Sequence, residues 1–328
     1  MSGFPATGIG SWPGISIDEA VRQSADLWAL PYLPELPGRG PWAEMIGRAL
    51  GAIDIGVERG PSRWQVASTS SSDQRRSRAM LRDDFDVLAE RFSDYAGPLK
   101  VSLAGPYTLL ACVDLVRGEA MVSDAGARRE LVQAHAAALA DLVHRLRQLV
   151  PGAQPVVQLD EPMLGMVADG AVRSASGIRR YAPVDAEEIG RAYRELCAVV
   201  DRAGASPLVV HSCAPAPWRT LVEAGIGAAA VDADRPGNID VLAEHVDGGG
   251  ALWLGIVPTG PGSATLSVDQ VVARALDWLR PLELGRRLEG HLTLTPACGL
   301  AGFSPAAAVA VAETLAEAGD LVAERLFS

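Results

Sequence analysis

Short apolar runs alternate with longer amphipathic stretches along most of the chain, and this alternation predicts strands and helices in turn. The apolar runs are rich in Val, Leu, Ile and Ala, as buried strands are. We expect strands at residues 6–10, 30–33, 99–104, 155–160, 208–211, 228–232, 252–257 and 292–295. Apolar side chains at helical spacing predict helices at residues 16–27, 76–96, 126–149, 186–203, 268–279 and 304–321.

Eight strand-like runs separated by helices favour an α/β fold in which a parallel sheet closes into a single (β/α)8 TIM barrel. A doubly wound open sheet is the alternative, but no G-x-G-x-x-G motif opens the first helix, so a dinucleotide-binding version is disfavoured. No linker divides the chain, and we expect residues 1–328 to form one catalytic barrel domain. Two long loops are expected, near residues 60–75 and 166–185.

Composition narrows the choice of partners. The chain has 40 acidic and 29 basic residues and a net charge of −11, which makes binding to nucleic acid or to an anionic membrane surface unfavourable. The first residues lack the basic and apolar regions of a signal peptide, and no apolar run is long enough to span a bilayer. With only 4 cysteines, spread along the chain, we expect a cytoplasmic protein with reduced thiols and no disulfide framework.

A histidine and two cysteines follow the ends of predicted strands. His211 and Cys213 come at the end of the run 208–211 and, because successive side chains of an extended chain alternate, point the same way. Cys298 follows the run 292–295. One His and two Cys with an open fourth position are typical of a catalytic zinc site, and Asp232, Asp234 or water is a candidate for that position. Cys112 and Cys197 lie in apolar helical surroundings and are interpreted as structural.

Carboxylates follow two other runs. Asp160 and Glu161 end the run 155–160 and are stopped by Pro162. Because their side chains diverge, we expect Asp160 to face the site and Glu161 to bond to the scaffold. Glu35 lies in a stiff, proline-rich segment after the run 30–33.

A glycine-containing turn, Ile9-Gly10-Ser11, follows the first run, and its exposed amides suit a carboxylate ligand. In a parallel barrel the carboxyl ends of the strands meet at one mouth, where active sites form. All these residues are therefore expected to converge there.

In this order the motifs resemble the catalytic barrel of the cobalamin-independent methionine synthase family, which shares a superfamily with uroporphyrinogen decarboxylase. The resemblance spans most of the chain and is closest to the stand-alone core type of the family. It is carried by Ile9-Gly10-Ser11, Glu35, Leu159-Asp160-Glu161-Pro162, His211-Ser212-Cys213, Asp232 and Cys298-Gly299-Leu300.

The resemblance implies a zinc-dependent methyltransferase that methylates a thiol, homocysteine, to give methionine. It implies a zinc ion held by His211, Cys213 and Cys298, with Asp232 where the family has a glutamate ligand. Ile9, Gly10 and Ser11 would bind the homocysteine carboxylate, and Glu35 and Asp160 its amino group. Asp160, His211, Cys213 and Cys298 are the expected catalytic set.

The chain also departs from the family pattern. Full-length members carry a second, amino-terminal barrel, for which 328 residues leave no room. Cys112 stands where the family has the tryptophan that stacks on folate, Met166 where it has a second glutamate, and Pro258 where it has a proton-donating histidine. The methyl donor is therefore left open between a methylated corrinoid protein and methylfolate. Two other functions stay open: a metal-free decarboxylase-like enzyme, with Arg39 and Arg63 at its mouth, and a zinc-dependent protein that binds a thiol metabolite.

Overall fold

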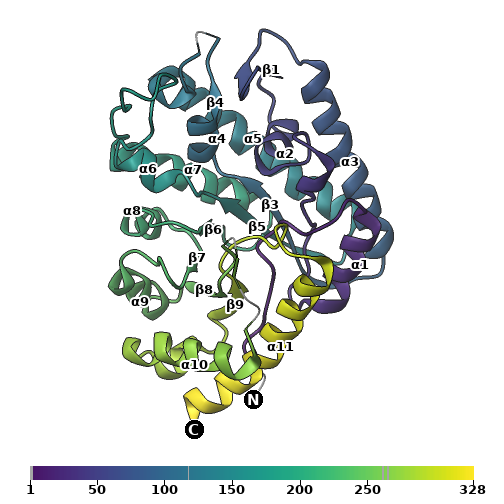
Figure 1. Cartoon of the computed structure of the whole chain (residues 1–328), viewed down its shortest axis with the longest axis vertical. Coiled ribbons are helices and arrows are strands. Elements are labelled where there is room, and N and C mark those ends of the chain that lie inside the picture. Colours follow the sequence, from purple (N-terminus) through teal and green to yellow (C-terminus); the bar gives the residue numbers. More distant parts are fainter. Residues whose placement is uncertain (1–2, 117, 261, 264–265) are drawn as a thin grey trace.

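A six-stranded parallel sheet forms the centre of the protein (Figure 1). The computed structural model describes residues 3–116, 118–260, 262–263 and 266–328. Neighbouring strands follow the order β3-β5-β6-β7-β8-β9. They comprise β3 (Gly97–Ala104), β5 (Ala153–Asp160), β6 (Val209–Ser212), β7 (Ala228–Asp232), β8 (Ala251–Val257) and β9 (Leu292–Pro296). The α/β class and the parallel sheet are as predicted, and six of the eight predicted runs are strands of this sheet.

The other two predicted strands are extended segments that make isolated bridges. Ala6 bridges Leu294 of β9, and Tyr32 bridges Lys100 of β3, both in the parallel sense. The two segments also meet each other, because the Leu30 amide donates to the Ala6 carbonyl oxygen at 3.4 Å. Prolines without an amide proton and glycines in these segments prevent a continuous ladder. They span the interval between β9 and β3, but the strands of the sheet number six in the described part of the chain.

Helices connect consecutive strands and lie outside the sheet in Figure 1. Helix α5 (Ala125–Leu149) precedes β5, and α7 (Ala186–Arg202) leads into β6. The other helices are α1 (Ile17–Leu27), α2 (Met45–Ala52), α3 (Ser72–Arg91), α4 (Pro106–Cys112), α6 (Leu164–Ala168), α8 (Trp218–Glu223), α9 (Ile239–Asp247), α10 (Val268–Leu279) and α11 (Pro305–Phe327). Each of the six predicted helices is present, with end points shifted by up to six residues.

The segment predicted as a loop near residues 60–75 is partly ordered. Strands β1 (Val57–Arg59) and β2 (Trp64–Val66) pair as a hairpin, β2 pairs with the short β4 (Val113–Asp114), and α3 already begins at Ser72. The buried Trp64 side chain anchors this small sheet, a contact that the polar local sequence does not signal. The second predicted loop, near 166–185, contains the last residues of α6 and then runs without a helix or strand up to α7.

The interior of the sheet is apolar at one end and polar at the other. A small buried cluster contains Leu30, Val156, Val209, Ala228, Ala230 and Trp253. Because strand side chains alternate, Gln158 and Asp160 share a face with Val156, and His211 shares a face with Val209. The polar groups thus lie toward the carboxyl ends of the strands.

The amino-terminal segment packs against the last helix. The Phe4 amide donates to the Gly319 carbonyl oxygen at 3.2 Å, and the Phe4 ring meets that of Phe327 edge-on. The two ends of the chain therefore lie close together (Figure 1). Among the described residues, no helix combines the length and the apolar character that crossing a membrane requires.

Candidate metal and substrate site

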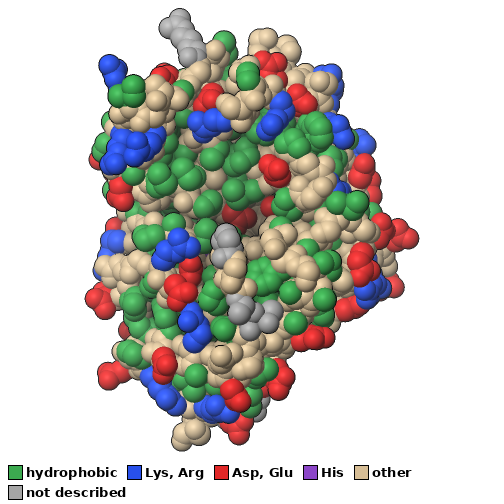
Figure 2. Space-filling model, in the orientation of Figure 1, with side chains coloured by type: hydrophobic (Ala, Val, Ile, Leu, Met, Phe, Trp, Pro, Cys, Tyr) green, Lys and Arg blue, Asp and Glu red, His purple; other side chains and the backbone are tan. Residues whose placement is uncertain are grey.

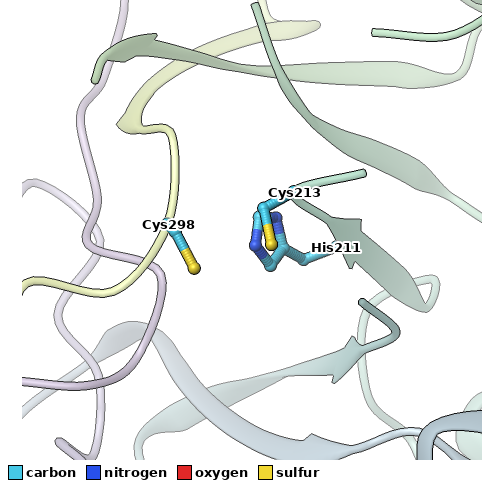
Figure 3. A group of neighbouring side chains, drawn as sticks. All are labelled: His211, Cys213 and Cys298. Atoms are coloured by element: carbon cyan, nitrogen blue, oxygen red, sulfur yellow. The ribbon is translucent and has the colours of Figure 1, made fainter. Parts of the chain in front are cut away.

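His211, Cys213 and Cys298 form a compact group of metal-binding side chains. One ligand atom from each lies within 4.8 Å of the others. His211 is on β6, Cys213 follows β6 directly, and Cys298 follows β9. Figure 3 shows the Cys298 sulfur directed toward the His211 ring and the Cys213 sulfur. The group joins the carboxyl ends of two strands, β6 and β9, that are far apart in sequence.

The His211 ring is oriented to offer one nitrogen to a ligand. Its Nδ1 lies 3.2 Å from the Ala230 carbonyl oxygen, which assigns the proton to Nδ1. Its Nε2 is buried and has no hydrogen-bond partner among the described residues. An imidazole held through one nitrogen with the other left bare is the arrangement of a metal-binding histidine. The residues present therefore fit a zinc ion, for which one His and two Cys are a catalytic donor set.

The pKa values of the two thiols shift in opposite directions. The adjoining Cys298 thiol and then the His211 imidazole lower the pKa of Cys213 to about 4, against the effect of burial. The Cys213 sulfur and burial raise the pKa of Cys298 far above its usual range. Cys213 is thus the more acidic thiol of the pair, which suits it to bind a cation as a thiolate.

A cavity of about 220 Å³ lies against these three residues. The residues expected to bind the substrate line it together with the candidate metal ligands. Its walls comprise Ile9, Gly10, Ser11, Glu35, Pro37, Met45, Asp160, Pro162, His211, Cys213, Cys298 and Gly299. We call this space the substrate pocket. In Figure 2 the face shown is hollowed near its centre, with acidic atoms deep in the hollow and hydrophobic side chains gathered around it.

Two buried carboxyl groups occupy one part of the substrate pocket. Burial raises the pKa of Glu35 to about 7, opposed mainly by Arg48, whose Nε lies 3.7 Å from Glu35 Oε1. Burial raises the pKa of Asp160 to about 6, opposed mainly by His211. Such groups favour a cationic ligand, because a positive charge offsets the cost of burying them ionised.

Glu161 lies next to Asp160 in the sequence but faces away from the pocket. Its carboxylate accepts hydrogen bonds from the Thr108 amide at 2.7 Å, the Thr108 hydroxyl at 2.7 Å and the Tyr107 amide at 3.0 Å. The Tyr193 hydroxyl donates a fourth at 2.7 Å. Glu161 therefore fixes the start of α4 against β5, as expected for the outward-facing acid of the pair.

Asp232 lies near the metal group but is not part of it in the described chain. One carboxylate oxygen accepts from the Asp234 amide at 2.9 Å, and the other lies 3.2 Å from an Arg235 nitrogen. Asp232 and Asp234 instead line a second cavity of about 380 Å³, whose walls also include Cys213, Cys298 and Pro258. Whether either aspartate completes the metal coordination remains a prediction.

The arginines expected by a decarboxylase-like interpretation are occupied elsewhere. Arg39 makes two hydrogen bonds to Asp84, at 2.8 and 2.7 Å. Arg63 lies 3.0 Å from Asp114. Neither belongs to the described lining of the substrate pocket, whose charged side chains are acidic.

The sequence did not single out Met45, which belongs to the wall of the pocket and begins α2. Pro37 and Gly299 also belong to this wall, and they lie in the proline-rich segment and in the Cys298-Gly299-Leu300 motif that the sequence did mark. Gly299 permits close approach of two loops, because a Cβ there would lie 1.9 Å from Ser11 Oγ. Lys100 and Gln158 make a buried polar pair next to the pocket-lining Asp160. Polar residues inside the apolar runs 99–104 and 155–160 were the available signal.

Comparison with known proteins was informative at the level of structure. No family model matches the sequence, and no curated protein does. A B12-independent methionine synthase from Shewanella sp. W3-18-1, solved in complex with selenomethionine, superposes with a TM-score of 0.67 over 99% of both chains at 13% identity. The chain has the fold of B12-independent methionine synthases.

A second solved structure agrees. A protein from Listeria monocytogenes, provisionally assigned as a vitamin-B12-independent methionine synthase, superposes with a TM-score of 0.55 over 98% of both chains at 17% identity. The resemblance drawn from the motifs is thus confirmed for the fold, and chemistry must be argued from the site.

Proposed function

We propose that this protein is a zinc-dependent methyltransferase of the cobalamin-independent methionine synthase family, acting on a thiol, with homocysteine as acceptor and methionine as product. The observation that carries the proposal is the substrate pocket, because two buried carboxyl groups and a His-Cys-Cys group line the same cavity. Homocysteine has the matching pair of groups, an ammonium and a thiol.

His211, Cys213 and Cys298 would hold the zinc ion, with Asp232, Asp234 or water in the fourth position. When bound, zinc supplies the Lewis acidity that keeps the acceptor sulfur a thiolate at neutral pH, since a free thiol has a pKa of about 8.5. The hydrogen bond from His211 Nδ1 to the Ala230 carbonyl oxygen fixes the orientation of the imidazole ring and so keeps Nε2 directed at the metal position.

The remaining residues orient the acceptor. Glu35 and Asp160 would bind its ammonium group, and Ser11 with the neighbouring amides of Ile9 and Gly10 its carboxylate. Pro37, Met45 and Pro162 would enclose its methylene groups and exclude water. With the amino-acid end fixed, the sulfur faces the two cysteines, and positioning of this kind accounts for much of the rate of a methyl transfer.

The second cavity is the candidate approach for the methyl donor, because it meets the substrate pocket at Cys213 and Cys298. In the transfer, a bond forms between the acceptor sulfur and the methyl carbon while the bond between that carbon and the donor breaks, and its electron pair leaves with the donor. Pro258 in the wall of this cavity supplies no proton. This favours a methylated corrinoid protein, whose leaving group needs none, over methylfolate.

We also propose that residues 1–328 act as one catalytic barrel domain. The extended segments near Ala6 and Tyr32 would take the places of two barrel strands, since their bridges reach β9 and β3. This arrangement puts the turn 9–11 and Glu35 at the same mouth as the metal ligands.

Metal analysis tests the proposal. The protein purified without chelator should contain about one zinc ion per chain, and Cys298→Ser should lose it together with methyl transfer to homocysteine. Cys197→Ser is the matched control, because Cys197 is a half-buried cysteine of α7 outside the group. Absence of zinc from the wild type, or transfer retained by Cys298→Ser, contradicts the proposal.

A further inference from the structure

Lys100 is the single lysine of the chain, and it lies in the middle of β3 with no exposed surface. Its ammonium group donates to the Gly8 carbonyl oxygen, to the Ile9 carbonyl oxygen at 3.1 Å and to Gln158 Oε1 at 2.7 Å. An ammonium group has three protons to donate, so each has an acceptor. A buried cation with all its donors satisfied is a built feature of the interior, because an unpaired one would be very costly.

Gln158 links Lys100 to the substrate pocket through hydrogen bonds. Its Oε1 accepts from Lys100, and its Nε2 donates to Asp160 Oδ1 at 2.7 Å and to the Ile9 carbonyl oxygen at 2.7 Å. Both acceptors belong to pocket-lining residues. Lys100 itself does not line the pocket among the described residues, so any effect on a ligand passes through these neighbours.

We propose that Lys100 is a positioning residue for the amino-acid end of the substrate pocket. It fixes the turn at Gly8 and Ile9 directly, and it orients the Gln158 amide so that Asp160 presents its free oxygen to the ligand. This role rests on the proposed function, because it assumes an acceptor whose ammonium group meets Asp160.

Lys100 stabilises this arrangement for a chemical reason. Asp160 Oδ1 and the Ile9 carbonyl oxygen are both acceptors and require Gln158 Nε2 on their side, which leaves Oε1 to accept from the Lys100 ammonium group. Without the ammonium group, Gln158 Oε1 and the Gly8 and Ile9 carbonyl oxygens would each lose that buried donor. Each buried polar group that loses its partner costs about 1–3 kcal/mol, so the turn and the carboxylate would both shift.

The surroundings of Lys100 suit a buried cation. Its ammonium nitrogen lies 4.9 Å from the centre of the Tyr32 ring and 5.3 Å from that of Trp253, a distance at which aromatic faces attract cations. Burial lowers the pKa of Lys100 to about 7, and Asp160 and Glu35 oppose that shift. The two acids expected to bind the ligand's ammonium therefore also stabilise this cation.

The test compares two thiols. The zinc-loaded protein is titrated calorimetrically with L-homocysteine and with 1-propanethiol, which has the same thiol arm without the amino and carboxyl groups. Lys100→Met should weaken binding of homocysteine tenfold or more and change binding of propanethiol less than twofold, with zinc content unchanged. Lys100→Arg keeps a cation and should restore part of the difference. An equal loss for both thiols, or none for homocysteine, overturns the proposal.

Two further variants keep the test decisive. Gln158→Glu leaves an acceptor for Lys100 but removes the donor to Asp160, and it should reproduce the selective loss even where Lys100→Met fails to fold. Arg128→Met is the control for general destabilisation, because it removes a half-buried cation paired with Glu188 between α5 and α7. It should leave the ratio of the two affinities unchanged.

A readout that needs no ligand separates this proposal from the proposed function. The Trp12 amide donates to the Glu35 carbonyl oxygen, and the Glu35 amide donates to the Gly10 carbonyl oxygen. Hydrogen exchange at these two amides should accelerate in Lys100→Met but not in Arg128→Met. If the wild type does not prefer homocysteine over propanethiol, the proposed function fails, and the exchange result alone decides the role of Lys100. Unchanged exchange would show that Lys100 does not hold the turn.

Discussion

His135 makes the stability of the protein depend on pH in a way that can be calculated. It lies on α5 with no exposed surface, and its Nε2 lies 2.8 Å from the Ala104 carbonyl oxygen at the end of β3. Its Nδ1 is buried and lacks a partner in the described chain. Burial lowers the pKa of His135 from 6.5 to about 4, because a second proton would bring an unpaired charge into the core.

The sign follows from which state binds the proton first. Between about pH 6.5 and pH 4 the unfolded chain takes up a proton at His135 while the folded protein does not, so acidification favours unfolding. With these two pKa values, the free energy of unfolding falls by about 2 kcal/mol between pH 7 and pH 5 through this residue. The contribution of the neutral imidazole is fully present above pH 6.5 and is lost as the pH falls.

Replacing His135 by Gln isolates this effect. The Gln Nε2 can still donate to Ala104, but the side chain does not titrate. Urea unfolding of both proteins at pH 7 and pH 5, with a metal chelator present, should show the wild type losing about 2 kcal/mol more than the variant. His144→Gln, an exposed substitution on the same helix, controls for exchanging an imidazole for an amide. Parallel pH dependence of the wild type and His135→Gln would refute the argument.

Other substitutions test the site and its support. Glu161→Gln replaces one carboxylate oxygen by an amide group that donates. The oxygen lost is either the one that accepts two hydrogen bonds from Thr108 or the one that accepts from Tyr107 and Tyr193. Urea unfolding should show a free energy of unfolding lower by at least about 2 kcal/mol, and an unchanged midpoint would contradict the assigned role. Asp160→Asn removes a charge from the substrate pocket and should weaken calorimetric binding of homocysteine to the zinc-loaded protein by about tenfold to a hundredfold; equal affinity would exclude contact with the ammonium group. Ser267→Ala removes the capping box of α10 and should lower the free energy of unfolding by about 1 kcal/mol while zinc content stays the same.

The sequence predicted the elements whose local pattern and tertiary setting agree. The apolar run 228–232 became β7 with the same bounds, and residues 268–279 became α10 with its ends unchanged. The segments 6–10 and 30–33 are apolar and extended, yet Gly8, Pro31 and Pro34 interrupt their ladders, so isolated bridges replace strands. Whether an extended segment pairs continuously depends on its neighbours, which the run itself does not specify.

The site divides in the same way. His211 and Cys298 could be placed together because the carboxyl ends of parallel strands share one edge, whatever the details of closure. Lys100 and Met45 could not be assigned to the site from the sequence. A lysine in an apolar strand can be fully buried or can extend its ammonium group to solvent, and the local sequence does not distinguish the two cases. The turn at Gly8 and the side chain of Gln158 meet only after folding, which gives that lysine its acceptors.

A chain of 328 residues with one lysine, fully enclosed, offers amine-reactive reagents a single side-chain target that is hidden at rest. An activated ester can acylate Lys100 only when the centre of the sheet opens, so the labelling rate reports how often that opening occurs. Mass spectrometry of the peptide containing Lys100 then reads the opening frequency without any introduced probe. A ligand that binds only the closed form should slow the labelling by the factor by which it stabilises that form. The labelling rate of this one amine therefore reports whether a ligand occupies the substrate pocket.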